Sequence, residues 1–168
     1  NWELIIIDGS RNQRLLNEIE NMTGVVNGDR PAGKALSMEE IKKIHRFSAD
    51  ADVTYDYDGC VIKYIHMTTN GGISANCNHG IKFATGDYVG ILDHDDLLTP
   101  DALYYMSKAL VANEYKAKLV YSDEDKTDAK GKSFFEPNRK PNLNMDMILT
   151  NNYICHLACM KRSIFTML

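Results

Sequence analysis

Short apolar runs alternate along the chain with segments of helical periodicity, and this alternation constrains the fold more than any other feature. The runs lie at Trp2–Asp8, Cys60–Met67, Tyr88–Leu92, Lys118–Lys126 and Tyr153–Arg162. The first run has a β-branched centre, Ile5–Ile7, which is typical of a strand buried on both faces. The second run alternates enough to predict a half-buried strand. Strands that alternate with helices predict a layered α/β fold with a largely parallel sheet.

Helices are predicted between these strands from apolar spacing and end signals. Ser37 and Glu40 form a capping box, which predicts a helix over Met38–Ala49. Ser74 is expected to cap the helix after the second strand, with Gly86 at its C-terminal end. Further helices are predicted at Leu15–Met22, from Thr99-Pro100 onward and at Asn144–Thr150, and loops or turns at Val25–Ala35, Asp50–Gly59 and Asp128–Lys132.

The composition fits a globular protein and excludes some partners. The chain has 168 residues, of which 44% are hydrophobic and 25% charged, so one domain with a core is feasible and wholesale disorder is not. The formal charge is −4, and no basic stripe alternates with aromatic residues. We therefore expect no nucleic-acid partner.

Cysteine usage and hydropathy suggest a compartment. Cys60, Cys77, Cys155 and Cys159 are widely spaced and are predicted to be free, buried thiols, which suits a reducing environment. No apolar run approaches the roughly 20 residues that span a bilayer. We expect a cytoplasmic location, either free or at the inner face of the membrane. We expect no membrane span in this sequence.

Carboxylates follow several of the predicted strands. Asp8, Asp93, Asp95 and Asp123 all stand at strand ends, where open α/β sheets bind ligands. Clustered carboxylates need a compensating cation, and hard oxygen ligands suit Mn²⁺ or Mg²⁺ with substrate phosphates. On an extended segment Asp93 and Asp95 would point the same way. The alternative is that Asp95 or Asp96 only decorates the start of a turn.

Four separated blocks resemble a known family in their order and spacing. These are "NWELIIIDGS", "NGGISANCNHGIKFATGDYVGILDHDDLLTPDALYYM", "YSDEDKTDAKGK" and "KPNLNMDMILTNNYICHL". They are similar to family 2 glycosyltransferases, most of all to bacterial members that build polysaccharides. The resemblance implies a GT-A fold, a three-layer α/β/α sandwich with a mostly parallel central sheet. It also implies a nucleotide-diphosphate sugar donor, a glycan or lipid-linked acceptor, inversion and a divalent metal.

The resemblance implies roles for particular residues. Asp8 corresponds to the acid that contacts the nucleotide base. Asp93 and Asp95 correspond to the D-x-D motif, the first near the ribose and the second on the metal that bridges the diphosphate. The stretch from Asn70 places Asn70, Gly71, Gly72 and Ser74 beside the donor, with a plain turn and helix cap as the equal alternative.

Other family positions are weaker predictions. Asp123 and Asp125, in the block Ser122–Asp125, are candidates for the acceptor side or for supporting the site, as is Asp96. Surface acids beside a hairpin are the alternative for the first two. His156 is a family position as well, but a lone histidine in an apolar run is more often a core residue than a ligand.

The sequence also departs from the family pattern. The resemblance implies a strand before Trp2, and a general base, which takes the proton of the acceptor hydroxyl, beyond Leu168. We therefore assign no catalytic base, and we interpret residues 1–168 as a partial, incomplete catalytic domain that is inactive alone. Residues 11–59 are longer than the family usually has and are interpreted as an insert.

Two other functions stay open from sequence. A sugar-phosphate nucleotidyltransferase would also place acids at strand ends for a metal-bound phosphate. A non-catalytic interaction domain could keep the GT-A fold without its chemistry.

Overall fold

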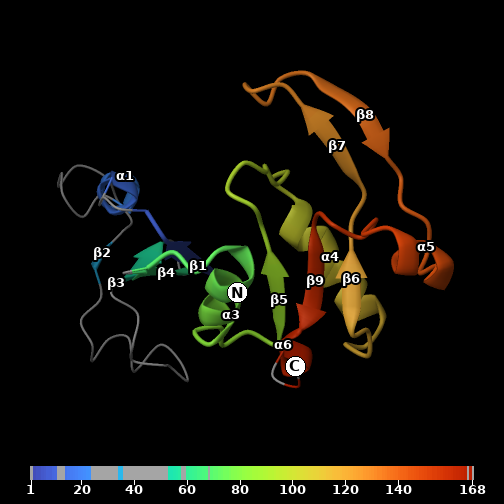
Figure 1. Cartoon of the computed structure of the whole chain (residues 1–168), viewed down its shortest axis with the longest axis horizontal. Helices are drawn as coiled ribbons and strands as arrows, with labels where there is room; N and C mark the ends of the chain where they lie inside the picture. Colours follow the sequence, from blue (N-terminus) through green and yellow to red (C-terminus); the bar gives the residue numbers. More distant parts are fainter. Residues whose placement is uncertain are drawn as a thin grey trace. The chain divides into compact units, whose positions relative to one another are not determined.

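The computed structural model describes residues 2–10, 14–23, 34–35, 53–57, 60–67, 69–165 and 167, and the chain divides after Gly86 into two units (Figure 1). The first unit contains β1 (Glu3–Asp8), α1 (Arg14–Thr23), β2 (Lys34–Ala35), β3 (Val53–Tyr57), β4 (Cys60–His66) and α3 (Ile73–Ile81). The second contains β5 (Tyr88–Ile91), α4 (Ala102–Ala112), β6 (Leu119–Tyr121), β7 (Glu124–Thr127), β8 (Phe134–Asn138), α5 (Met145–Thr150), β9 (Ala158–Lys161) and α6 (Arg162–Phe165).

The sheet of the first unit has the order β1-β4-β3-β2. β1 runs parallel to β4, with Ile5 opposite Lys63 and Asp8 opposite His66. The neighbouring pairs, β4 with β3 and β3 with β2, are antiparallel. Because β1 and β4 are parallel, their carboxyl ends lie at the same edge of the sheet.

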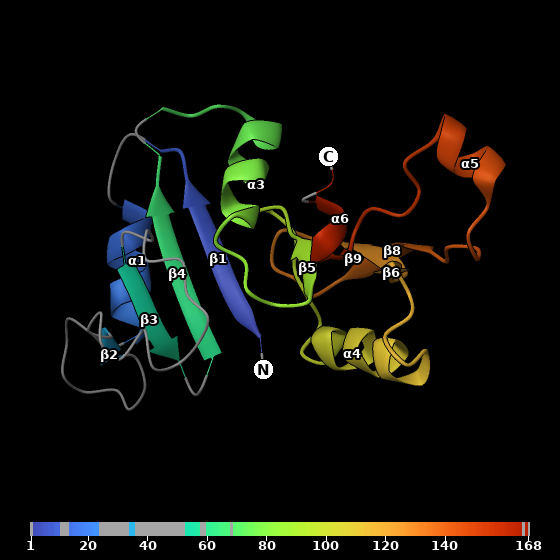
Figure 2. The same cartoon turned by 90° about the horizontal axis from the view of Figure 1, so that it is seen from below.

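Helices cover both faces of β1 and β4, as Figure 2 shows for α1 and α3. On one face Ile19 of α1 packs against Ile62 and Tyr64, which are buried. On the other face Gly80 of α3 lies so close to Ile7 that an added Cβ would sit 2.8 Å from its side chain. The α/β class is confirmed, and within this unit the arrangement is helix, sheet, helix.

An ion pair lies inside the face that α3 covers. The side chain of Lys63 is 0% exposed, and its Nζ donates to Glu3 Oε2 at 2.5 Å and to the carbonyl of Phe83 at 2.6 Å. Glu3 also accepts bonds from the backbone N of Thr85 and of Gly86. Burial alone would raise the pKa of Glu3, but these donors outweigh it and hold the pKa below its usual value.

Several local predictions for the first unit need correction. β4 is buried over Val61–Ile65, not half-buried, because it is central and has neighbours on both sides. β1 forms as predicted, but among the described strands it pairs with β4 alone, and Ile5–Ile7 are half-buried. Val53–Tyr57 pairs with β4 as β3, so the predicted loop over Asp50–Gly59 is wrong there.

The predicted helix over Met38–Ala49 lies outside the described residues. The prediction at Leu15–Met22 is confirmed by α1. In the predicted loop Val25–Ala35, the two described residues form β2.

The second unit has a three-stranded sheet in the order β5-β9-β6. β9 is antiparallel to both neighbours, so β5 and β6 are parallel to each other. Among the described strands, the four-stranded sheet is therefore mixed, with β1 and β4 parallel. Both ladders of the three-stranded sheet are antiparallel, although its outer strands run in the same direction. β7 and β8 form a separate hairpin, with the predicted turn at Asp128–Lys132, where Asp128 Oδ1 accepts the backbone N of Lys132.

Helices of the second unit begin near their predicted positions. α4 begins at Ala102 after Thr99-Pro100. The apolar spacing of this helix predicts that Leu103, Met106 and Leu110 are buried; Met106 and Leu110 are buried, while Leu103 is exposed. Asn144 caps α5 by accepting the backbone N of Met147. The four cysteines are free and half-buried, and none of the described helices is long and apolar enough to cross a membrane.

Candidate functional site

The carboxylate at the end of β1 is buried and held by hydrogen bonds. Asp8 is 5% exposed, and its Oδ2 accepts the hydroxyl of Tyr64 at 2.7 Å while its Oδ1 accepts the backbone N of Ser10 at 2.8 Å. Burial would raise the pKa of Asp8, but the bonds from Tyr64 and Ser10 lower it below its usual value. The group is thus an ionised, oriented carboxylate whose two oxygens already have protein donors.

The loop after β4 approaches the loop after β1 at the same sheet edge. An added Cβ at Gly9 would sit 2.9 Å from the side chain of Asn70, so the close contact requires glycine. Asn70 Oδ1 accepts the backbone N of Gly72 at 2.9 Å and the Nδ2 of Asn76 at 3.0 Å. The structure therefore brings Asp8 and the Asn70–Gly72 loop to one edge, as predicted for parallel strands.

The start of α3 differs from the sequence prediction. Gly72, not Ser74, is the N-cap, with φ 82° and ψ 174°, a conformation that only glycine adopts readily. The helix ends at Ile81, with Lys82 as C-cap, and Gly86 instead donates its N–H to Glu3. Ser74 lies exposed in the first turn.

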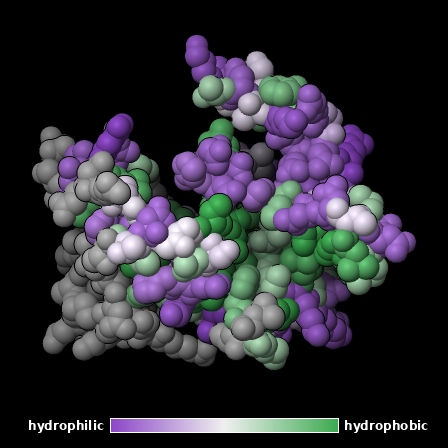
Figure 3. Space-filling view, viewed as in Figure 1, coloured by the Kyte–Doolittle hydropathy of each residue, from purple (hydrophilic) through white to green (hydrophobic). Residues whose placement is uncertain are grey.

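The acidic stretch after β5 forms a turn. The backbone N of Asp96 donates to the carbonyl of Asp93 at 3.2 Å, so residues i and i+3 come to the same side, where the extended geometry assumed from sequence would pair i with i+2. Asp95 points elsewhere, with its side chain 78% exposed and one oxygen 3.9 Å from Nδ1 of His94. Figure 3 shows hydrophilic residues gathered over this loop.

His156 joins the two acids of this turn. Its Nε2 is 3.2 Å from Asp93 Oδ2 and its Nδ1 is 3.8 Å from Asp96 Oδ2. One ligand atom from each of the three residues lies within 4.8 Å of the others. His156 is thus part of a polar group, the Asp93–Asp96–His156 group, and is not a core histidine as the sequence had favoured.

The donor atoms of this group fit a divalent ion. Side chains of Asp93, Asp96 and His156 are 49%, 41% and 36% exposed, so an ion and its waters can reach them. Three atoms that each lie about 2.1 Å from one ion are at most about 4.2 Å apart, so Asp93, Asp96 and His156 would hold an ion after small side-chain shifts. An imidazole ligand favours a transition ion such as Mn²⁺ over Mg²⁺, which prefers oxygen.

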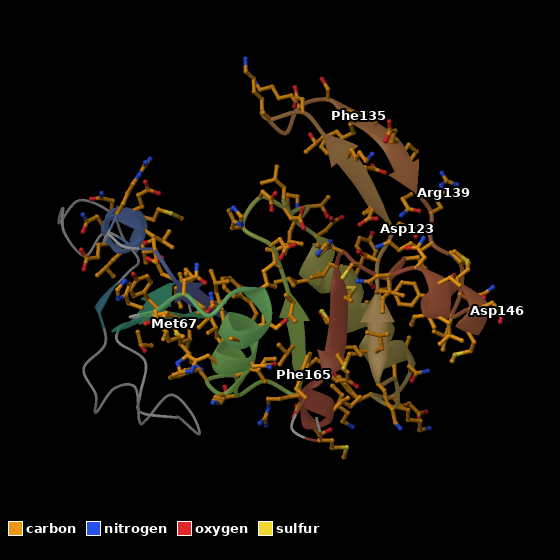
Figure 4. All side chains as sticks on the ribbon, viewed as in Figure 1. Met67, Asp123, Phe135, Arg139, Asp146 and Phe165 are labelled. Atoms are coloured by element: carbon orange, nitrogen blue, oxygen red, sulfur yellow. The ribbon has the colours of Figure 1, made fainter. Side chains whose placement is uncertain are left out.

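Side chains of the block Ser122–Asp125 hold the chain at His156. Glu124 Oε2 accepts the backbone N of His156 at 2.8 Å, and Ser122 Oγ accepts the backbone N of Leu157 at 3.3 Å. Asp123 Oδ1 instead accepts the backbone N of Lys140 at 2.8 Å, at the base of the β7–β8 hairpin (Figure 4). Asp125 is exposed on β7.

Glu124 is charged and well supplied with donors. Burial would raise its pKa, but the backbone N of His156, the side chain of Asn138 and the charge of Lys140 together lower it below the usual value. The Nζ of Lys140 is 3.4 Å from Glu124 Oε2, and the Lys140 side chain is 1% exposed. Neither residue was singled out from sequence. The sequence signal that could have identified Glu124 is the alternation of side chains along a strand. On an extended segment Glu124 points to the face opposite that of Asp123 and Asp125.

Comparison with known sequences identifies the family of this chain. Residues 47–168 match Glycosyl transferase family 2, a range that contains the Asp93–Asp96–His156 group and the blocks from Asn70 onward, but not Asp8. An uncharacterized protein of Sinorhizobium fredii is 38% identical over 97 residues, which are 58% of this chain and 10% of that protein.

Two further relatives carry functional names. The O-antigen biosynthesis protein RfbC of Myxococcus xanthus is 32% identical over 60% of this chain and 8% of its own length. An uncharacterized glycosyltransferase of Rickettsia felis is 33% identical over 45% of this chain and 12% of its own length. The chain spans about a tenth of the length of these relatives. Because the family match covers well over half of the sequence, the chain belongs to glycosyl transferase family 2, with a GT-A-type α/β fold.

Proposed function

We propose that this chain is the donor-binding part of a metal-dependent, inverting glycosyltransferase that moves a hexosyl group from a nucleotide-diphosphate sugar to a glycan or lipid-linked acceptor. The observation that carries the proposal is the Asp93–Asp96–His156 group, whose three ligand atoms meet within 4.8 Å. It lies in the part of the chain that matches the family.

The chemistry of these residues suits a diphosphate. A bound divalent ion would offset the charge that develops on the leaving diphosphate. Asp93, Asp96 and His156 would hold that ion, and the exposed Asp95 would remain near it on the same turn. The D-x-D motif predicts Asp95 as the metal ligand, whereas the turn favours Asp93, Asp96 and His156. The prediction for Asp95 therefore remains an alternative.

The donor side and the acceptor side rest on family membership. Asp8, Asn70, Gly71, Gly72 and Ser74 remain predicted donor contacts, of which Asp8 is already oriented by Tyr64. A relative named for O-antigen biosynthesis supports a polysaccharide acceptor and hence bacterial cell-envelope work at the cytoplasmic side of a membrane. Asp123 accepts a hydrogen bond from the backbone of Lys140 at the base of the hairpin. This contact favours a structural role for Asp123 over contact with the acceptor.

A binding experiment on the full-length protein tests the metal assignment. We expect Mn²⁺ to strengthen binding of uridine or thymidine diphosphate, measured by calorimetry, and Asp93→Asn and Asp96→Asn each to reduce that gain at least 10-fold, as loss of a charged ligand should. Asp146→Asn, an exposed acid on α5, is the matched control and should bind as the unmodified protein does.

Adding Asp95→Asn to this series separates the alternatives. If Asp95→Asn removes the Mn²⁺ effect and Asp96→Asn does not, the extended D-x-D assignment replaces the turn. If Mn²⁺ strengthens binding in none of the proteins, metal dependence is wrong. Metal-dependent nucleotide binding without sugar transfer by the full-length protein would favour a non-catalytic domain.

A further inference from the structure

The main chain at His156 is held on both sides by charged side chains from other segments. Glu124 accepts its backbone N–H at 2.8 Å, and the Nζ of Lys140 donates to its carbonyl oxygen at 2.8 Å. Lys140 also reaches the carbonyl of Ile154, at 3.5 Å. Both peptide groups of the residue that carries the imidazole are therefore fixed by groups distant in sequence.

The side chains of Lys140 and Glu124 form an ion pair that has further hydrogen-bond partners. Lys140 Nζ is 3.4 Å from Glu124 Oε2, and Glu124 Oε1 accepts the Nδ2 of Asn138 at 2.8 Å. The Lys140 side chain is 1% exposed, so its ammonium group has given up water for these contacts. A buried charge with this many fixed partners has little freedom to move, and it can restrain the peptide to which it bonds.

We propose that Lys140 and Glu124 are positioning residues for the metal site, which fix the peptide of His156 so that its imidazole stays beside Asp93 and Asp96. The inference rests on the proposed function, because it needs the Asp93–Asp96–His156 group to bind a divalent ion. Neither Lys140 nor Glu124 would touch the ion. Groups that orient metal ligands in this way typically contribute 10- to 100-fold to metal affinity.

The test uses Mn²⁺ alone and the full-length protein. Binding is measured from the loss of the free-ion electron paramagnetic resonance signal, and imidazole coordination from ¹⁴N modulation in pulsed spectra. Lys140→Met keeps the side-chain length and removes the ammonium group. We expect it to weaken Mn²⁺ binding 10- to 100-fold and to reduce the ¹⁴N modulation.

A mutant cycle distinguishes positioning from general destabilisation. If Lys140 acts through His156, adding Lys140→Met to His156→Ala should not weaken Mn²⁺ binding further. An additive effect would overturn the inference. Lys126→Met is the matched control, because Lys126 is an exposed lysine of the β7–β8 hairpin that pairs with Glu136. It should bind Mn²⁺ as the unmodified protein does.

Variants of Glu124 provide a second test, which decides the question if Lys140→Met does not fold. Glu124→Gln retains a carbonyl oxygen that can accept the backbone N–H of His156, whereas Glu124→Ala removes it. We expect Glu124→Ala to lose at least 10-fold in Mn²⁺ affinity and Glu124→Gln to recover most of it. A folded Glu124→Ala with unchanged Mn²⁺ affinity would overturn the inference.

Failure of the inference and failure of the proposed function give different results. If His156→Ala and Asp93→Asn bind Mn²⁺ as the unmodified protein does, the metal site itself is wrong, and the positioning role with it. If those two variants lose affinity while folded Lys140→Met and Glu124→Ala do not, only the positioning role is wrong.

Discussion

The two units each place a carboxylate at the end of a strand, but in opposite environments. Asp8 is buried, and both its oxygens accept hydrogen bonds from the protein. Asp93 and Asp96 are exposed, lie on a turn, and face a histidine instead of a hydroxyl or a backbone donor. An acid of the first kind contributes to stability through its partners, whereas acids of the second kind repel one another until a cation arrives.

The comparison predicts which substitutions will act on folding and which on binding. Changes inside the first unit should reduce stability and leave Mn²⁺ affinity unaltered. Changes at the Asp93–Asp96–His156 group should reduce Mn²⁺ affinity and leave stability without metal nearly unaltered.

The largest expected effect is on the buried ion pair of the first unit. Glu3→Ala leaves the ammonium of Lys63 inside the protein without its carboxylate, which typically costs about 3–5 kcal/mol of unfolding free energy. Amide hydrogen exchange in β1 and β4 measures the loss locally. Protection unchanged from that of the unmodified protein would contradict the role given to this pair.

Asp8→Ala should cost less, about 1–3 kcal/mol, because a buried hydroxyl and a backbone N–H lose their acceptor. The effect should depend on pH. The folded-state pKa of Asp8 is below its usual value, so its contribution is complete above the unfolded-state pKa of about 4 and is lost as pH falls through the folded-state value.

Urea denaturation from pH 7 to pH 3 checks this dependence. The difference in stability between the unmodified protein and Asp8→Ala should shrink below about pH 4. A constant difference would mean that Asp8 acts through packing alone.

Sequence patterns predicted the elements better than the contacts between them. β1, β4, β5 and α5 follow from local apolar runs and a cap, which are properties of neighbouring residues. β3 was missed because its acidic, tyrosine-containing sequence resembles a loop, and its strand pairing depends on β4.

The sequence pointed to the acids after β5 but not to their grouping with His156. Asp93 and Asp96 come together through a backbone hydrogen bond from Asp96 to Asp93, which their spacing does not encode. His156 and Glu124 are 32 positions apart, so no local pattern could connect them.

A comparable effect is expected at the loop after β4, where Asn70 approaches Gly9. Gly72→Ala forces a side chain into the backbone conformation φ 82°, ψ 174°, which glycine alone adopts readily, and this costs about 1–3 kcal/mol. An added Cβ there would meet nothing within 4 Å, so any loss reports backbone strain and not a clash. Gly71→Ala tests a steric clash for comparison, since its added Cβ would sit 2.8 Å from that of Ala75. Equal stability of Gly72→Ala and the unmodified protein would contradict the backbone argument.

The smallest effect on stability is expected at the exposed acids. Asp96→Asn should change the unfolding free energy by less than about 0.5 kcal/mol without metal, as surface substitutions usually do. Mn²⁺ should raise the unfolding temperature of the unmodified protein, because an ion that binds only the folded state stabilises it, and this rise should largely disappear in Asp96→Asn. Differential scanning calorimetry with and without Mn²⁺ measures both quantities. A large loss of stability without metal would place Asp96 with Asp8 as a structural acid, and the contrast between the two units would fail.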